Sequence, residues 1–153
     1  MKKLSLFTLF FLVTMQNAFA NDLLNTYCKE LGGEVRKTYQ CPKSRLKLSF
    51  GFCVFENDQG IEQFFDGCTG PDGGHTALFY PHCIKHDLCY HHEPISNGLK
   101  QKDCDQEFRD GLLRSCRQAK SEKKCRAWAK TMYRAVRMFG VLAFNCANYE
   151  ASY

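Results

Sequence analysis

The sequence predicts a mainly α, disulfide-rich fold with a small N-terminal β meander. Ten cysteines in 153 residues give an even count that fits up to five disulfides. Two segments in the second half of the chain repeat apolar residues at intervals of three and four, which is the period of amphipathic helices. The earlier part of the chain has short aromatic stretches divided by glycine turns, which indicates strands.

The N-terminus predicts an export signal. Lys2 and Lys3 precede an apolar run from Leu4 to Met15, and Ala18-Phe19-Ala20 has the small-x-small pattern of a cleavage site. The run is shorter than the ~20 residues that span a bilayer, which disfavours a membrane anchor. We therefore predict a cleaved signal peptide at residues 1–20 and a secreted or periplasmic protein.

Residues 21–65 are predicted to form a cysteine-containing, β-rich segment that packs with a helical domain of residues 66–153 as one compact unit. Its expected elements are a helical turn or two at residues 22–31, β-prone residues 34–39, an aromatic stretch at 49–55 and, after a turn at 57–60, a short strand at 61–65. We expect this meander to support the helices, with a lid over the site as the alternative. The sequence leaves open the three pairings among Cys28, Cys41, Cys53 and Cys146.

A loop rich in aspartate and glycine follows at residues 66–81. Asp66 supplies a carboxylate, and the glycines allow backbone carbonyls to turn toward one point, which suits a hard cation with oxygen ligands. A plain Asp/Gly turn is the alternative interpretation. Near the end of the loop, Leu78, Phe79 and Tyr80 are expected to be core, with the rim of an acyl-chain slot as the alternative.

A short helix predicted around His86 carries the residues most suited to chemistry. Cys83, His86 and Cys89 recur at intervals of three. Tyr90 lies four residues after His86, so these side chains share one side of the helix. The arrangement places a base between two thiols.

A second, downstream segment predicts how that histidine is held. If this segment is helical, a Cys89–Cys104 disulfide clamps the two helices side by side. The clamp brings Asp105 next to His86. An imidazole held by a carboxylate activates water, and Asp87, one residue further round the helix, can serve a nearby hard cation.

Zinc is an alternative explanation for the crowded cysteines and histidines of this region. The sequence has no Cys-x-x-Cys pair, however, and export to an oxidising space favours disulfides over thiolate ligands. His91 and His92 are expected to be solvated, in a turn that Pro94 and Gly98 mark.

Two longer helices are predicted, from Lys102 to Gln118 and from Arg126 to Phe144. The second has an apolar stripe that is expected to be core. This stripe consists of Trp128, Met132, Ala135, Val136 and Phe139. Cys116 and Cys125 bracket the charged loop between the helices and are expected to pair.

The charge is distributed unevenly. The formal net charge is +5, and residues 114–137 hold nine basic residues against one acidic residue, Glu122. A solvated helix face explains much of this asymmetry, and attraction to an anionic lipid surface explains it as well. We expect no nucleic-acid partner, because export separates the protein from nucleic acid.

Three separated motifs occur in one order along the chain. They are Asp66-Gly67-Cys68-Thr69, Cys83-x-x-His86-Asp87-x-Cys89-Tyr90 and Cys104-Asp105-x-x-Phe108. Together they resemble the secreted phospholipase A2 superfamily in its bacterial and fungal branch. Three motifs in the right order are stronger evidence for a family than one motif alone. The resemblance covers residues 66–140.

The resemblance implies that His86 and Asp105 are catalytic and that Tyr90 supports them by donating its hydroxyl to Asp105. It implies Ca²⁺ as the cofactor, held by the Asp66 side chain, the Gly67 carbonyl and the Asp87 side chain. The disulfides expected with this arrangement are Cys68–Cys83, Cys89–Cys104 and Cys116–Cys125.

The implied function is calcium-dependent hydrolysis of the sn-2 ester of a glycerophospholipid to a lysophospholipid and a fatty acid. His86 would activate the water, and a loop N–H such as that of Gly67 would help the cation to bear the oxyanion charge. The sequence has no Gly-x-Ser-x-Gly elbow, which disfavours a serine lipase. We expect a monomer whose partner is a phospholipid membrane surface, with anionic lipid favoured.

Two other classes of function compete with this one. A catalytically silent, phospholipase-like membrane-binding module or toxin is known in this superfamily where the aspartate beside the histidine is replaced, but here His86 and Asp87 are both present. The second is a disulfide-rich structural or inhibitor domain, whose stability calcium would leave unchanged.

Overall fold

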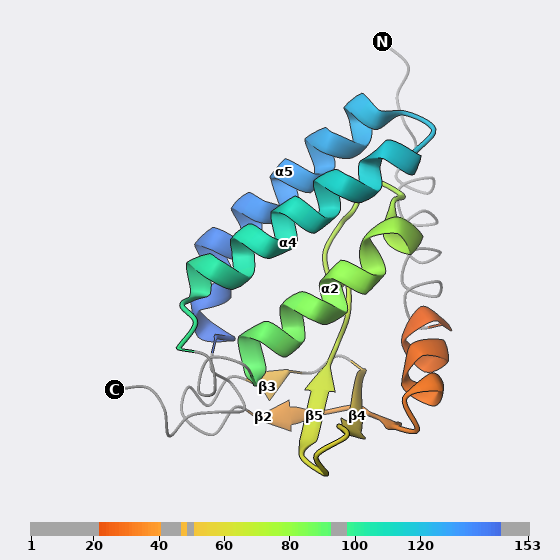
Figure 1. Ribbon diagram of the computed structural model, residues 1–153, viewed down its shortest axis with the longest axis vertical. Coiled ribbons are helices and arrows are strands. Elements are labelled where there is room, and N and C mark those ends of the chain that lie inside the picture. Colours follow the sequence, from red (N-terminus) through yellow and green to blue (C-terminus); the bar gives the residue numbers. More distant parts are fainter. Residues whose placement is uncertain (1–21, 41–46, 49–50, 93–97, 145–153) are drawn as a thin grey trace, which may run out of the picture.

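The computed structural model describes residues 22–40, 47–48, 51–92 and 98–144. It confirms the predicted class, a mainly helical, disulfide-containing chain with a small antiparallel meander (Figure 1). The elements are a helix at residues 22–30, β1 (Glu34–Arg36), β2 (Tyr39–Gln40), β3 (Lys47–Leu48), β4 (Phe52–Glu56), β5 (Glu62–Phe65), α2 (Thr76–His91), α4 (Gln101–Ser115), the 3-10 helix η1 (Cys116–Gln118), α5 (Glu122–Phe139) and the 3-10 helix η2 (Gly140–Leu142). The predicted signal peptide lies outside the described residues.

The long helices α2, α4 and α5 lie side by side and form the body of the molecule (Figure 1). The Cys89–Cys104 disulfide joins the end of α2 to the start of α4. Nearer the start of α2, Nε2 of His82 is 2.7 Å from Oγ of Ser115, the last residue of α4. Because the end of one helix meets the start of the other, α2 and α4 are antiparallel, as the sequence predicts.

Helix α5 returns alongside α4. The Cys116–Cys125 disulfide closes the short connection between them. At the far end of the pair, the Gln101 side-chain amide donates to the Val136 carbonyl at 3.1 Å. These contacts at both ends make α4 and α5 a second antiparallel pair. Within the described parts of the chain, no helix combines the length and the apolar character needed to cross a membrane.

The meander lies at one end of the helical layer (Figure 1). Strand β4 is central in an antiparallel sheet of order β1-β4-β5, and β2 pairs with β3. A Cys28–Cys53 disulfide ties the helix of residues 22–30 to β4. This bridge gives the partner of Cys28, which the sequence leaves open. Cys41 and Cys146 lie outside the described residues.

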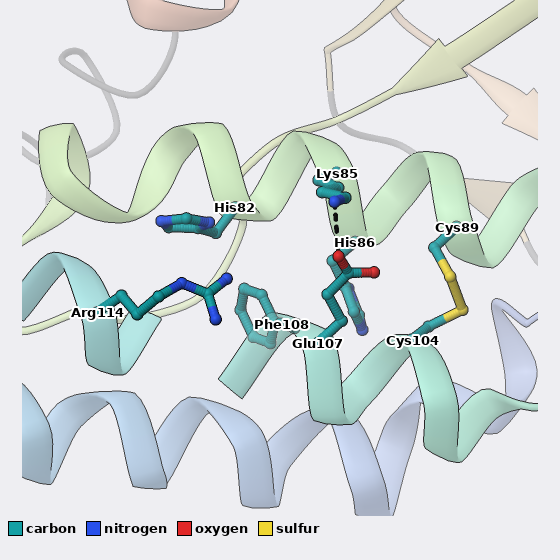
Figure 2. A pocket seen from close by; sticks show the side chains of 8 residues that line it. All are labelled: His82, Lys85, His86, Cys89, Cys104, Glu107, Phe108 and Arg114. Atoms are coloured by element: carbon teal, nitrogen blue, oxygen red, sulfur yellow. Dashed lines mark ion pairs between the residues drawn. A yellow bond between two sulfur atoms is a disulfide. The ribbon is translucent and has the colours of Figure 1, made fainter. Parts of the chain in front are cut away.

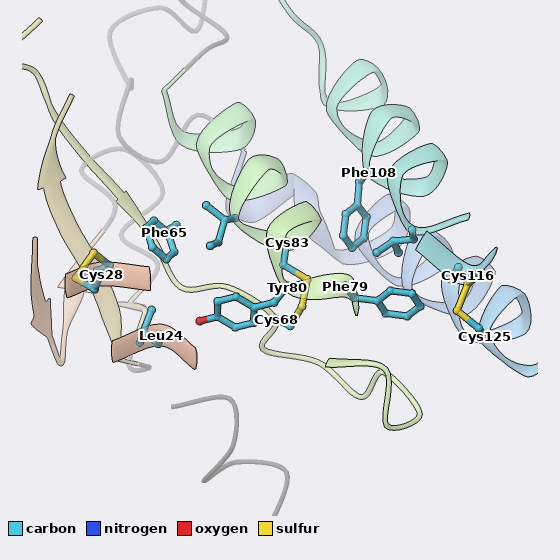
Figure 3. Packing of buried hydrophobic residues seen from close by; sticks show 14 of the residues in the cluster. Leu24, Cys28, Phe65, Cys68, Phe79, Tyr80, Cys83, Phe108, Cys116 and Cys125 are labelled. Carbon is cyan, nitrogen blue, oxygen red and sulfur yellow. A yellow bond between two sulfur atoms is a disulfide. The ribbon is translucent and has the colours of Figure 1, made fainter. Parts of the chain in front are cut away.

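Hydrophobic packing runs without a break from the meander into the helices (Figure 3). Leu24 and Phe65 lie at the meander end, and Phe108 lies between the helices. Phe79 and Tyr80 are fully buried, so the prediction that they are core is confirmed. The disulfides add to the stability of a domain of this size, because each typically contributes about 2–4 kcal/mol to the free energy of unfolding.

Helix α2 starts earlier than the sequence predicts. It begins at Thr76, although the sequence indicates a loop as far as Pro81, which instead lies inside the helix. Proline has no backbone N–H, so Pro81 cannot donate the helical hydrogen bond to the Ala77 carbonyl. Burial of Phe79 and Tyr80 next to Pro81 offsets that loss.

Candidate active site

His86 and Asp105 meet between α2 and α4. Nε2 of His86 is 2.9 Å from Oδ1 of Asp105, and the hydroxyl of Tyr90 donates to the same oxygen at 2.5 Å. An ionised aspartate only accepts hydrogen bonds, so Nε2 carries the proton and Nδ1 is left as an acceptor. Nδ1 has no hydrogen-bond partner among the described residues. The imidazole is therefore held by one nitrogen and has the other available.

Arg137 on α5 is a third donor to Asp105. Its Nη1 donates to Oδ2 at 2.7 Å, so both carboxylate oxygens are hydrogen-bonded. Burial opposes ionisation of Asp105, but the hydrogen bonds that it accepts, the one from His86 foremost, outweigh burial and lower its pKa. Burial and the bond to Asp105 raise the pKa of Tyr90. Asp105 is thus a buried carboxylate that donors from two helices hold in place.

Asp66, Gly67 and Asp87 form a second polar group. Oδ2 of Asp87 accepts the backbone N–H of Asp66 at 3.1 Å and that of Gly67 at 2.7 Å. The Cys68–Cys83 disulfide fastens this loop to α2. Because the Gly67 N–H donates to Asp87, it is not free to donate to an oxyanion, which corrects that expectation.

Gly67 packs directly on Tyr80. The φ of Gly67 is 74°, and a Cβ added there would lie 2.6 Å from the Tyr80 hydroxyl. Both the conformation and the lack of space therefore require glycine. The Tyr80 hydroxyl is buried and has no hydrogen-bond partner in the described parts of the chain. Burial, then the charges of Asp87 and Asp66, raise the pKa of Tyr80.

The donor set of this second group fits a hard cation. Burial raises the pKa of Asp66, and burial together with the charge of Asp66 raises the pKa of Asp87 well above its ordinary value. Two close carboxylates suit calcium, which takes six to eight oxygen ligands. The described residues contain no cluster of three or more His, Cys, Asp or Glu side chains that could hold a metal. Loop carbonyls and water would therefore have to complete a calcium shell.

A cleft of ≈370 Å³ is lined by His86 and Tyr90 of the first polar group and by all three residues of the second. The rest of its lining includes the apolar stripe of α5, namely Met132, Ala135, Val136 and Phe139. The prediction that this stripe is core is wrong for Phe139, which is 71% exposed, and for Ala135, which is exposed as well. The other three, Trp128, Met132 and Val136, are partly buried and pack against the core. Helix α5 buries Cys125 and Ala129, and the neighbouring stripe borders the cleft.

Exposed apolar side chains gather where α5 passes into η2. Met138, Phe139 and Val141 are 65%, 71% and 63% exposed. Phe139 also lines the cleft, so this apolar surface adjoins its mouth. A Cβ added at Gly140 would lie 2.4 Å from the Tyr90 hydroxyl, which shows how closely the same segment approaches the polar groups.

A family model of prokaryotic phospholipase A2 matches residues 52–140, a range that includes both polar groups and all of α5. The chain belongs to the prokaryotic phospholipase A2 family. The resemblance indicated by the sequence motifs is confirmed, and the family range begins earlier than those motifs, at Phe52 in β4. No curated protein and no solved structure matches the chain.

The family range includes two strands of the meander. It contains β4 and β5, which the sequence analysis assigns to the N-terminal segment. Phe65 of β5 packs in the same core as residues of α2 and α4. The boundary at residue 65 stays a prediction.

Next to His86 lies a second, much smaller hollow, of ≈20 Å³ (Figure 2). The Lys85–Glu107 ion pair links α2 and α4 beside it, and Arg114 borders it as well. A space of this size holds about one water molecule. The hollow is therefore too small for a lipid molecule.

The expectation that His91 and His92 are solvated is wrong. His91 is buried, and its ring stacks on Phe64 with 4.5 Å between centroids. Burial lowers the pKa of His91 to about 3 and that of His92 to about 4. Nε2 of His92 accepts the Phe64 backbone N–H at 2.9 Å. Both histidines thus join α2 to β5, an interface that no local sequence pattern indicates.

The predicted site residues of the family come together in two groups. His86, Tyr90 and Asp105 form one, and Asp66, Gly67 and Asp87 form the other. The expected bridges Cys68–Cys83, Cys89–Cys104 and Cys116–Cys125 are present. Sequence reasoning does not find Arg137, because it is one of nine basic residues in its stretch. It also assigns Tyr80 to the core and misses the contact with Gly67.

Proposed function

We propose that the chain is a calcium-dependent phospholipase A2, which hydrolyses the sn-2 ester of a glycerophospholipid to a lysophospholipid and a fatty acid. Family membership supports a lipolytic hydrolase. The observation that carries the proposal is the composition of the cleft. Its lining combines the hydrogen-bonded His86, the Asp66–Asp87 pair and the apolar stripe of α5.

His86 is the general base in this proposal. Its Nδ1 takes the proton from the water that attacks the ester carbonyl. Asp105, ionised and hydrogen-bonded to Nε2, fixes the ring and stabilises the imidazolium that forms. As the tetrahedral intermediate collapses, the same proton passes from Nδ1 to the leaving glycerol oxygen. The reaction requires no serine or cysteine nucleophile.

The Asp66 side chain, the Gly67 carbonyl and the Asp87 side chain would hold calcium. When bound, the ion supplies positive charge that polarises the ester carbonyl and stabilises the developing oxyanion. Two backbone N–H groups already fix one oxygen of Asp87. The packing of Gly67 on Tyr80 keeps the loop close to α2.

We propose a phospholipid membrane surface as the partner of a monomeric, exported enzyme. Met138, Phe139 and Val141 would enter the lipid beside the mouth of the cleft, because exposed apolar patches of this kind mark interaction sites. The basic residues of the C-terminal helices favour anionic lipid. The disulfides fit a secreted or periplasmic location, where thiols are oxidised.

The test is fatty-acid release from mixed vesicles of phosphatidylglycerol and phosphatidylcholine by the oxidised mature protein. Release is measured with calcium and then with excess chelator, for the wild type, His86→Asn and His82→Asn. His82 lies one turn before His86 on the same helix but is hydrogen-bonded to Ser115, so it serves as the matched control.

Release of the sn-2 acid that needs calcium and His86, but not His82, would support the proposal. Release that persists in chelator would contradict calcium as the cofactor. Release that persists in His86→Asn would contradict His86 as the general base. No release by fully oxidised protein would instead favour the catalytically silent membrane-binding module.

A further inference from the structure

The Asp105 carboxylate receives hydrogen bonds from two helices. Oδ1 accepts from His86 and Tyr90, both on α2, and Oδ2 accepts from Arg137 on α5. The Asp105 side chain is 0% exposed. Without Arg137, Oδ2 would be a buried carboxylate oxygen with no partner among the described residues.

We propose that Arg137 is a positioning residue, whose guanidinium orients the Asp105 carboxylate and balances its charge. Through Asp105, α5 as well as α2 then fixes the orientation of the His86 ring. An aspartate carboxylate turns easily about its last torsion, and a donor on the second oxygen restricts that rotation. If Oδ2 loses its donor, a carboxylate that rotates or takes up a proton becomes more favourable, because a buried oxygen without a hydrogen bond costs free energy. For its kinetic test, this inference rests on the proposed function.

Arg109 allows a matched comparison. The Arg109 and Arg137 side chains are each 35% exposed, and each pairs with an aspartate. The distance is 2.8 Å for Arg109 to Asp110 and 2.7 Å for Arg137 to Asp105. The Asp110 side chain is 48% exposed and does not line the cleft. Arg109→Gln therefore removes the same charge and the same kind of ion pair without touching Asp105.

The kinetic experiment uses short-chain phosphatidylcholine below its critical micelle concentration, with saturating calcium. This substrate offers no lipid surface, so a role of Arg137 in membrane attraction cannot contribute. Arg137→Gln should lower kcat about 10- to 100-fold with KM changed less than about threefold. Arg137→Lys keeps a charge and a donor and should recover part of that loss. Arg109→Gln should stay within about twofold of the wild type.

A double-mutant cycle with Asp105→Asn separates positioning from a general effect on folding. If Arg137 acts through the carboxylate, Arg137→Gln should change kcat less than about threefold in the Asp105→Asn background. A full loss of kcat in that background would overturn the inference. A kcat of Arg137→Gln equal to that of Arg109→Gln would overturn it as well.

A second measurement needs no catalysis. The titratable groups that face Asp105 are His86 and Tyr90 from α2 and Arg137 from α5. Carboxyl ¹³C NMR of the aspartate-labelled protein should show Asp105 protonating at higher pH in Arg137→Gln than in the wild type. An unchanged titration overturns the positioning role. If the wild type hydrolyses no lipid but this titration moves, the proposed function fails and the positioning role stands. If Arg137→Gln does not fold, Arg137→Lys is compared in its place.

Discussion

The two buried carboxylate sites beside His86 differ in how their charge is balanced. Asp105 meets a guanidinium and two further donors, and these lower its pKa. Asp66 and Asp87 meet each other and two backbone N–H groups, and their pKa values are raised. The shifts are opposite because Asp105 accepts hydrogen bonds from His86, Tyr90 and the Arg137 cation, whereas Asp66 and Asp87 are desolvated beside each other with no cation among the described residues bonded to them.

This difference separates the roles of the two sites. A carboxylate with its own counter-charge stays ionised and can orient a histidine through a whole reaction cycle. A pair of carboxylates without a counter-charge is stabilised when a hard cation binds from solution. The contrast assigns Asp105 to the proton-transfer step and Asp66 with Asp87 to the cation in the proposed function.

The largest expected effect tests the cation site. Asp87→Lys should lower calcium-dependent hydrolysis at least about 10³-fold and abolish calcium binding, because an ammonium group would lie beside Asp66 in place of the ion. The fold should remain, since disulfides hold it. Vesicle assays, calcium calorimetry and circular dichroism measure the three outcomes. Asp110→Lys controls for the change in charge. A variant that failed to fold would contradict the separation of site from scaffold.

The next largest effect tests the Asp105 site. Asp105→Asn should lower kcat about 10²- to 10⁴-fold, because the amide no longer stabilises the imidazolium or fixes its tautomer. Calcium affinity should change less than about threefold, since Asp105 belongs to the other site. Steady-state kinetics and calorimetry on the same preparation give both values. A parallel loss of calcium binding would show that the two sites are not independent.

Calcium should stabilise the folded protein through the second site. At 100 times its Kd, the ion should add about 2.7 kcal/mol to the free energy of unfolding. Asp66→Asn should abolish that gain and should stabilise the calcium-free protein, because it removes like-charge repulsion from Asp87. Asp105→Asn should keep the gain. Urea unfolding with calcium and with chelator measures all of these. An equal gain in Asp66→Asn would place the ion elsewhere.

The last prediction concerns His91, a buried base that has no part in the proposed reaction. The pKa of His91 is about 3 in the folded protein and about 6.5 when it is unfolded. The unfolded chain binds more protons between these values, so this contribution to stability is present above about pH 6.5 and falls by about 1.4 kcal/mol per pH unit below it. His91→Phe should remove that slope while keeping the stack on Phe64. Urea unfolding of both proteins between about pH 7.5 and 4.5 tests this, and parallel curves would contradict it.

Short sequence intervals predict most of the candidate site. Helical spacing and a disulfide are enough to bring His86 and Asp105 together, because the spacing acts within a turn of helix and the disulfide joins cysteines only 15 residues apart. Arg137 is different, since it lies 32 residues from Asp105. Its place there depends on how α5 returns along α4, which local spacing does not encode. The fold class is likewise predictable, whereas the pairing of Cys28 is not.

The apolar stripe of α5 shows a second limit. Periodicity identifies which residues share a face, as it does for Met132 and Phe139, but it does not say what lies against that face. The face borders the cleft here, so a pattern typical of core residues marks the wall of the cleft. His91 is the opposite case, a polar residue whose burial depends on Phe64 of a distant strand.

The order of the disulfides along the chain bears on how they form during folding. Cys68–Cys83, Cys89–Cys104 and Cys116–Cys125 each join cysteines that follow one another in the sequence, with separations of 15, 15 and 9 residues. A chain that is oxidised as it emerges can form these three bridges in order. Cys28 and Cys53 instead pair across Cys41. Oxidation of neighbouring cysteines strictly in order would first join Cys28 to Cys41, and thiol–disulfide exchange would then have to replace that bond, whereas the three bridges around His86 and Asp105 would need no such step.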